Sequence, residues 1–284
     1  TEATAIMNDY NIKLSLLMST PSEEEQKTAQ TDNTLANVTA NFEGRFTYMG
    51  GGASLNPLIH QYNAEEVSEE ITKQFRTQAE TLLEDGAVGF GEMSILHMSL
   101  GETHAFEEVE ADHPLFLLLA DIAAEHDVPI DVHLDIVQED RATPQEHLEM
   151  SSQNPETLKG NVEGFKRLLA HNRNAKIVLA HASSDTIGDL DIGLLYELLE
   201  ENENLYLQMR LQPNPENDVD SPIDKNNIVR EEWVELFEAY PERFILGSDT
   251  FYGEAKTHVL QRTQGFLQQL PEELAKKIAC ENAK

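Results

Sequence analysis

Cysteine and long apolar runs are nearly absent from this chain of 284 residues. The single cysteine, Cys280, excludes an internal disulfide framework, and the helical pattern around it, PEELAKKIACENAK, predicts that its side chain is buried. The longest apolar run, residues 114–120, is far shorter than the roughly 20 residues that a membrane-spanning helix needs. We therefore expect a soluble chain that does not cross a membrane.

Basic residues are also scarce, since 20 Lys and Arg stand against 52 Asp and Glu and give a formal net charge of −32. Such a surface repels nucleic acid and anionic membranes, so neither is an expected partner. An acidic excess is common in proteins adapted to high salt, and it also keeps an ordinary surface solvated, so charge alone leaves both interpretations open. The first residues, TEAT, show no leader sequence, and the localisation stays unknown, with cytoplasm and periplasm both open.

Short apolar runs rich in β-forming residues alternate with longer segments in which apolar residues recur at helical spacing. The predicted strands are residues 12–18, 46–49, 87–90, 129–133, 176–180, 205–209 and 244–246. The predicted helices are residues 2–10, 67–83, 115–125, 158–170, 190–199, 233–239 and 259–267.

This alternation predicts an α/β fold of parallel strands joined by crossover helices. The links from helix to strand are short, whereas those that follow Glu92, His133 and Met209 are long. Long loops at the carboxyl ends of the strands are typical of the active-site face of a (β/α)8 TIM barrel. The predicted strands are one short of a complete barrel, so the first β-strand is expected to be missing. No linker divides the chain, and residues 1–284 are predicted to form a single domain.

Four predicted strands end in a potential metal ligand: Glu92, His133, His181 and Asp249. Two imidazoles and a carboxylate, with a water completing the sphere, suit a catalytic Zn²⁺ or a similar divalent ion. A lone histidine at a strand end is more often part of the scaffold. Four such residues at one face are hard to assign to packing, and they predict a metal site there.

Three further residues are candidates for substrate binding. Arg210 follows a strand and is suited to clamp a carboxylate or phosphate, although pairing with one of the many carboxylates is an equal alternative. His97 lies on the loop after Glu92, and Tyr252 follows Asp249 closely enough to reach the mouth of a barrel. The run GGG at residues 50–52 predicts a tight turn near the pocket, and Trp233 and the seven other histidines are interpreted as structural or exposed.

The sequence resembles the amidohydrolase superfamily, in particular the TIM-barrel metal-dependent hydrolases called amidohydrolase 2. The resemblance is carried by YMGGGASLNPLI, GAVGFGEMSILHMSL, ADHPLFLLLADIAAEHDVPIDVHLD, RLLAHNRNAKIVLAHAS, ERFILGSDTFYG and LAKKIACENAK. It implies that Glu92 bridges two metal ions, that His133 and His181 hold the second ion, and that Asp249 is both a ligand and the catalytic proton relay. The family's His-x-His motif has no counterpart here and is expected on the missing first strand.

The resemblance implies metal-dependent hydrolysis of an amide, lactone, ester or phosphoester bond in a small-molecule substrate. One or two zinc ions are expected, with Mn, Fe or Co as alternatives for the same ligands. Two other interpretations stay open: a single-metal, non-oxidative decarboxylase of the same superfamily, and a truncated binding protein without catalysis. The expected oligomer is a homodimer.

Overall fold

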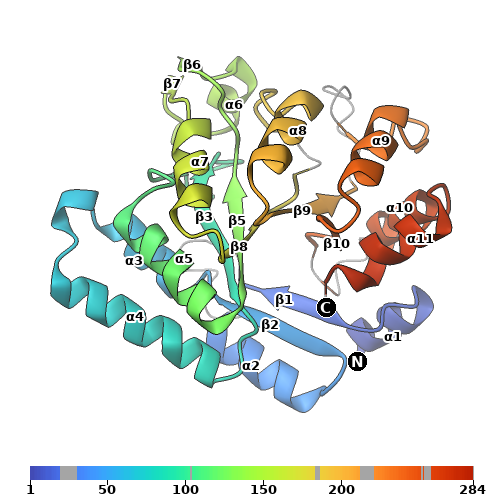
Figure 1. Ribbon diagram of the computed structural model, residues 1–284, viewed down its shortest axis with the longest axis horizontal. Helices are drawn as coiled ribbons and strands as arrows, with labels where there is room; N and C mark the ends of the chain where they lie inside the picture. Colours follow the sequence, from blue (N-terminus) through green and yellow to red (C-terminus); the bar gives the residue numbers. More distant parts are fainter. Residues whose placement is uncertain are drawn as a thin grey trace. The chain divides into compact units, whose positions relative to one another are not determined.

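The computed structural model describes residues 1–19, 31–102, 104–182, 186–211, 221–250, 252 and 257–283 (Figure 1). It divides into two compact units, which we treat separately: unit 1 is Thr1–Lys13 with Leu179–Lys284, and unit 2 is Leu14–Val178. The chain crosses from one unit to the other within strand β8, Lys176–Leu179.

Unit 2 is built on parallel strands that are neighbours in the order in which they occur along the chain. They are β1 (Ser15–Met18), β2 (Phe46–Gly51), β3 (Phe90–His97) and β5 (Pro129–Leu134). Ser15 is paired with Phe46 in the first pair, and Phe90 is paired with Ile130 in the last. The short strand β4 (Glu107–Glu108) adds to β3 in the antiparallel direction, and β6 (Arg141–Ala142) pairs with β7 (Thr157–Leu158) in a separate ribbon.

The helices of unit 2 follow these strands and pack on them. They are α2 (Asp32–Asn41), α3 (Leu55–Gln61), α4 (Glu69–Glu84), α5 (Pro114–His126), α6 (Gln145–Met150) and α7 (Val162–His171), with a 3-10 turn at Ala64–Glu66. Helix α2 packs on β2, α3 on β3, and α5 on β5. Helix α5 also contacts both α4 and α7, which explains why it is apolar around most of its circumference.

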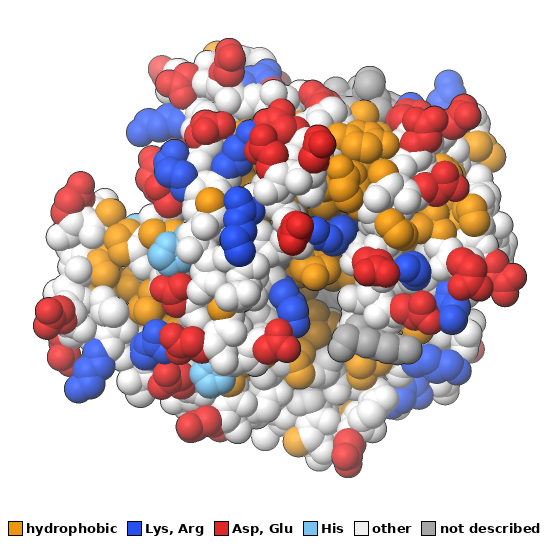
Figure 2. All heavy atoms as spheres, in the orientation of Figure 1, with side chains coloured by type: hydrophobic (Ala, Val, Ile, Leu, Met, Phe, Trp, Pro, Cys, Tyr) orange, Lys and Arg blue, Asp and Glu red, His pale blue; other side chains and the backbone are white. Residues whose placement is uncertain are grey.

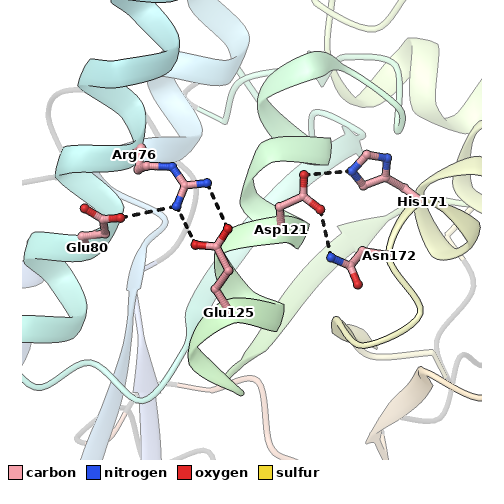
Figure 3. Close-up of polar contacts among 6 residues, drawn as sticks. All are labelled: Arg76, Glu80, Asp121, Glu125, His171 and Asn172. Atoms are coloured by element: carbon pink, nitrogen blue, oxygen red, sulfur yellow. Dashed lines mark hydrogen bonds and ion pairs between the residues drawn. The ribbon is translucent and has the colours of Figure 1, made fainter.

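Polar contacts join these three helices on their outer sides (Figure 3). Arg76 of α4 donates to both carboxylate oxygens of Glu125 on α5, at 2.7 and 3.3 Å. On the other side of α5, Asp121 contacts His171 at 3.1 Å and accepts a hydrogen bond from Asn172 at 2.9 Å, at the end of α7. These contacts fix α5 between its two neighbours.

Unit 1 contains the parallel pair β9 (Leu205–Arg210) and β10 (Phe244–Gly247), in which Gly247 is paired with Arg210. Its helices are α1 (Glu2–Asp9), α8 (Ile192–Glu201), α9 (Glu231–Ala239), α10 (Thr257–Leu267) and α11 (Glu272–Lys276), followed by a π-helical turn at Lys277–Glu281. Phe237 lies at the centre of the core, with the rings of Trp233, Phe244 and Phe266 at centroid distances of 4.7 to 5.8 Å. The predicted packing role of Trp233 is confirmed.

Each of the seven predicted strands is present, and each predicted helix is found within a few residues of its expected bounds. Strand β3 differs, because it overlaps the predicted strand 87–90 only at Phe90 and pairs with β5 and β4 as far as His97. The prediction that Glu92 ends its strand is therefore wrong, since Glu92 lies near the start of β3, and His97 lies at the end of β3 rather than on a loop.

The prediction of a buried Cys280 is wrong, because its side chain is exposed. In this last turn the buried side chain is that of Ile278. No helix in the described part of the chain is long and apolar enough to cross a membrane.

Candidate metal site

Strand β5 and the residue after it present three polar side chains in succession on one face: Asp131, His133 and Asp135. They alternate with Ile130 and two other apolar residues, so the two-residue period of a strand turns all three toward the same side. All three are buried, with 3 to 7% of each residue exposed. Buried carboxylates and imidazoles need polar partners or a cation, so this face is a candidate site.

Glu92 of β3 and His133 of β5 lie in contact, as the sequence predicts for two ligands of one site. Oε1 of Glu92 is 2.9 Å from Nδ1 of His133, and only 13% and 9% of the two side chains are exposed. Ser94, two residues further along β3, is paired with His133 across the two strands. The parallel pairing of β3 with β5 therefore creates this contact.

The spacing of these two atoms is close to that required by a shared divalent metal ion. Bonds from imidazole nitrogen and carboxylate oxygen to zinc are about 2.0 to 2.2 Å long, so two ligands of a tetrahedral ion are about 3.4 Å apart. Nδ1 and Oε1 are 2.9 Å apart, at hydrogen-bonding distance, so a further separation of about half an ångström would let both atoms bind one ion. The pair thus supplies one nitrogen and one oxygen ligand of the kind that zinc and similar ions accept.

Asp135 lies on the opposite side of the His133 ring, with Oδ2 3.6 Å from Nε2 of the imidazole. Burial by itself lowers the pKa of His133, but the two carboxylates outweigh it and raise this pKa to about 10. The same contacts hold the pKa of Asp135 well below its usual range, although burial by itself raises it. Without a metal ion, His133 therefore serves as the cation between two carboxylates.

His97 packs against His133 with ring centroids 4.0 Å apart and the planes at 62°. Its other neighbour is His104, at 4.4 Å. Burial and then the positive charge of His133 lower the pKa of His97 to about 3, so His97 is neutral at physiological pH. The uncharged ring of His97 thus lines one side of the site, next to the predicted ligand His133. The predicted contact of His97 with substrate stays a prediction.

Residues 50–52 span the end of β2 and the first residue of the turn that follows, where the glycines allow the chain to approach β3 and the residue after β1 closely. A Cβ atom on Gly52 would lie 2.3 Å from the carbonyl oxygen of Ser19 and 2.9 Å from that of Glu92. The same Ser19 carbonyl accepts a hydrogen bond from the backbone N–H of Glu92 at 3.3 Å. The predicted tight turn is present, since the backbone N–H of Ser54 donates to the carbonyl oxygen of Gly51 at 3.1 Å and Gly51 has a φ of 105°. The close packing at Gly52 restricts the backbone that carries Glu92.

The other two predicted ligands, His181 and Asp249, belong to unit 1. The backbone N–H of His181 donates to Oε1 of Gln208 at 2.9 Å. The side-chain amide of Gln208 packs against Gly247, where an added Cβ atom would lie 2.5 Å from that amide. Gln208 lies within β9 and is buried, and its hydrogen bond holds the backbone at the partly exposed His181.

Arg210 pairs with Asp249, with Nη1 2.8 Å from Oδ2. Of the two alternatives for this arginine, the structure contains the ion pair, and its partner is the predicted catalytic aspartate rather than an unrelated surface carboxylate. Tyr252 is partly exposed, and its contact with substrate stays a prediction.

Asp135 and His104 are parts of the site that were not predicted from the sequence. The alternation D-V-H-L-D in residues 131–135 carries the signal for Asp135, because residues two apart on a strand share a face. His104 follows β3 on a loop, where only the tertiary structure reveals its contact with His97.

Three solved structures resemble this fold over nearly the whole chain. An uncharacterised TIM-barrel protein from Bordetella bronchiseptica is 14% identical and has a TM-score of 0.60, over 99% of this chain and 79% of its own. A dihydroorotase from Saccharomyces cerevisiae in complex with 5-fluoroorotic acid is 11% identical, with a TM-score of 0.53 over 99% and 78% of the two chains. A 5-methylcytosine deaminase from Klebsiella pneumoniae with 5-fluorocytosine is 12% identical, with 0.51 over 98% and 60%.

These similarities establish the fold as that of a (β/α)8 TIM barrel, as the sequence predicts. The sequence profile of the amidohydrolase family matches residues 19–284. The chain therefore belongs to the amidohydrolase family, within a superfamily of metal-dependent hydrolases. A search of curated protein sequences finds no significant match.

Proposed function

We propose that this protein is a hydrolase that uses metal-activated water to cleave an amide, lactone, ester or phosphoester bond in a small-molecule substrate. The observation that carries the proposal is the buried contact between Glu92 and His133 at 2.9 Å, on two paired parallel strands. Because the chain belongs to the amidohydrolase family, we interpret this contact as part of a metal site. An imidazole and a carboxylate side by side suit a catalytic divalent ion.

In this proposal Glu92 and His133 hold the metal, and His181 and Asp249 supply further ligands. The assignment of the last two rests on their positions at predicted strand ends and on the family resemblance. A divalent ion, zinc by preference, supplies Lewis-acid activation of water and of the bond under attack. Manganese, iron or cobalt would accept the same ligands.

The protein's own residues provide orientation and proton transfer. Asp249 accepts the proton of the attacking water at a carboxylate oxygen, and Arg210 holds that carboxylate in place through its contact at 2.8 Å. The neutral ring of His97, packed on His133, forms a mostly buried wall that keeps bulk water away from this side of the site. Arg210 and Tyr252 are proposed to contact the substrate when it binds.

Metal content per chain tests this proposal, measured on the protein and on the His133→Ala variant after incubation with Zn²⁺ and removal of free metal. We expect at least about one equivalent in the unaltered protein and a large loss in His133→Ala, because a ligand is missing. His171→Ala is the matched control, since His171 is exposed and its Nε2 lies 3.1 Å from Oδ2 of Asp121 on α5 (Figure 3).

Retention of metal in the control, together with loss in His133→Ala, supports the site. The proposal is wrong if the unaltered protein binds neither Zn²⁺ nor Mn²⁺, or if His133→Ala binds them equally well. With the metal bound, a panel of lactone, amide, ester and phosphoester substrates then tests the reaction. Release of carbon dioxide from small acids, without hydrolysis of that panel, would support the decarboxylase alternative instead.

A further inference from the structure

Asp135 is a buried carboxylate that no part of the proposed chemistry uses. Only 7% of it is exposed, and it lies two residues after His133 on the same face of the chain. Placing a carboxylate in such a position is costly unless its charge is balanced and its oxygens are hydrogen-bonded. The groups around Asp135 must therefore supply this charge balance and these hydrogen bonds.

The backbone around the site fixes Asp135 independently of His133. Its Oδ2 atom accepts a hydrogen bond from the backbone N–H of Met98 at 2.8 Å. Its own N–H donates to the carbonyl oxygen of Leu96 at 2.9 Å, and its carbonyl oxygen accepts from Nδ2 of Asn161 at 2.9 Å. The position of this carboxylate is thus set in advance by three hydrogen bonds to neighbouring segments of unit 2.

The imidazole of His133 lies between this fixed carboxylate and Glu92. Nδ1 lies 2.9 Å from Glu92, and Nε2 lies 3.6 Å from Oδ2 of Asp135. The ring of His97 packs across it at 4.0 Å, which restricts rotation of the imidazole. Once a cation takes the place of the Nδ1 proton beside Glu92, the Asp135 carboxylate facing Nε2 favours the tautomer with its proton on Nε2, in which the lone pair of Nδ1 is directed toward the cation.

We propose that Asp135 is a positioning residue that holds His133 in the tautomer and orientation in which Nδ1 binds a divalent cation beside Glu92. This inference rests on the proposed function and adds a residue to it. Carboxylates that accept the second N–H of a metal-bound histidine raise its basicity as a ligand, and their removal typically costs about 10- to 100-fold in metal affinity.

Asp135→Asn is the decisive variant, because an amide oxygen can still accept the hydrogen bond from Met98 while the negative charge is lost. We expect about a 10-fold weaker affinity for Co²⁺ or Zn²⁺ and a changed visible spectrum of the Co²⁺ form. Asp112→Asn is the matched control, since the same change there affects the exposed pair with Arg167.

A role limited to anchoring the Met98 segment predicts that Asp135→Asn binds the metal as tightly as the unaltered protein, and that result would overturn the inference while leaving the proposed function intact. Failure of the unaltered protein to bind metal would overturn both.

A measurement on the unaltered protein keeps the inference testable if the variant does not fold. Nitrogen-15 NMR of its zinc form should show the proton of His133 on Nε2 and the metal on Nδ1. The reverse assignment would contradict the role proposed for Asp135.

Discussion

Two glycines show how the surroundings of a residue decide its tolerance to substitution. A Cβ atom on Gly52 would lie 2.3 Å from the carbonyl oxygen of Ser19, a backbone atom that cannot move away cheaply, whereas one on Gly265 of α10 would meet no atom within 4 Å. We expect Gly52→Ala to destabilise the protein by about 1 to 3 kcal/mol through overpacking. Gly265→Ala should stabilise it by up to about 1 kcal/mol, because alanine favours the helix.

Urea unfolding of both variants measures these effects as shifts of the midpoint in opposite directions. An equal shift of both variants in one direction would show that the nearby backbone oxygens of Ser19 and Glu92 do not constrain Gly52.

At the scale of single residues, Glu92 and His133 were predicted from the sequence as ligands, whereas for Asp135 the alternation in residues 131–135 gives only its face of the chain. Glu92 and His133 adjoin apolar runs, where polar residues are conspicuous. The role of Asp135 depends on Met98 and on the side of the imidazole that it faces, and neither is encoded in local spacing.

At the scale of elements, the contact between α4 and α5 offers a test of how much an outer ion pair contributes. Arg76 contacts Glu125 at 2.7 Å in a two-bond arrangement, yet 54% of the Glu125 side chain is exposed. We therefore expect a coupling energy below about 1 kcal/mol from a double-mutant cycle of Arg76→Ala and Glu125→Ala. A parallel cycle of Arg76→Ala and Glu84→Ala serves as the control. Glu84 lies about two turns further along α4, and its coupling energy with Arg76 should be near zero.

The coupling between Arg76 and Glu125 should depend on pH in a definite direction. The hydrogen bond from Arg76 lowers the pKa of Glu125 in the folded state. A lowered pKa stabilises the fold above the unfolded value of about 4.3, and this contribution is lost as the pH falls through the folded value. Cycles repeated at pH 7 and near pH 3 should show a smaller coupling at the lower pH, and an unchanged coupling at both would contradict the ionic interpretation.

Most strands and helices were predictable from the sequence alone. The alternation of strand and helix repeats locally, so apolar spacing identifies each strand and most helices without knowledge of their partners. The extension of β3 to His97 was not predictable from spacing, because it depends on pairing with β4 and β5.

For the whole molecule, the net charge of −32 predicts a stability that rises with salt. Asp and Glu side chains are spread over the visible face in Figure 2, with Lys and Arg between them. Salt at 1 M shortens the screening length to about 3 Å and weakens repulsion among these carboxylates. Each 1 kcal/mol gained in this way should raise the Tm by roughly 2 to 4 °C.

Thermal unfolding in NaCl from low concentration to 1 M measures this effect. The Arg76→Ala, Glu125→Ala double variant is the control, because it shows whether screening of this one favourable ion pair decides the change of the Tm with salt. A Tm that falls steadily with salt would show that attractive pairs outweigh the net repulsion.

The sequence by itself determined the order of strands and helices, the family, and the polar residues that adjoin the apolar runs, because these depend on local periodicity and on motifs. The tertiary structure alone decided which side chains meet: Asp135 beside His133, Arg210 on Asp249, and Cys280 at the surface rather than in the core. Such contacts depend on strand register, on the extension of β3 and on how each turn packs. These are properties of the folded chain that no local pattern contains.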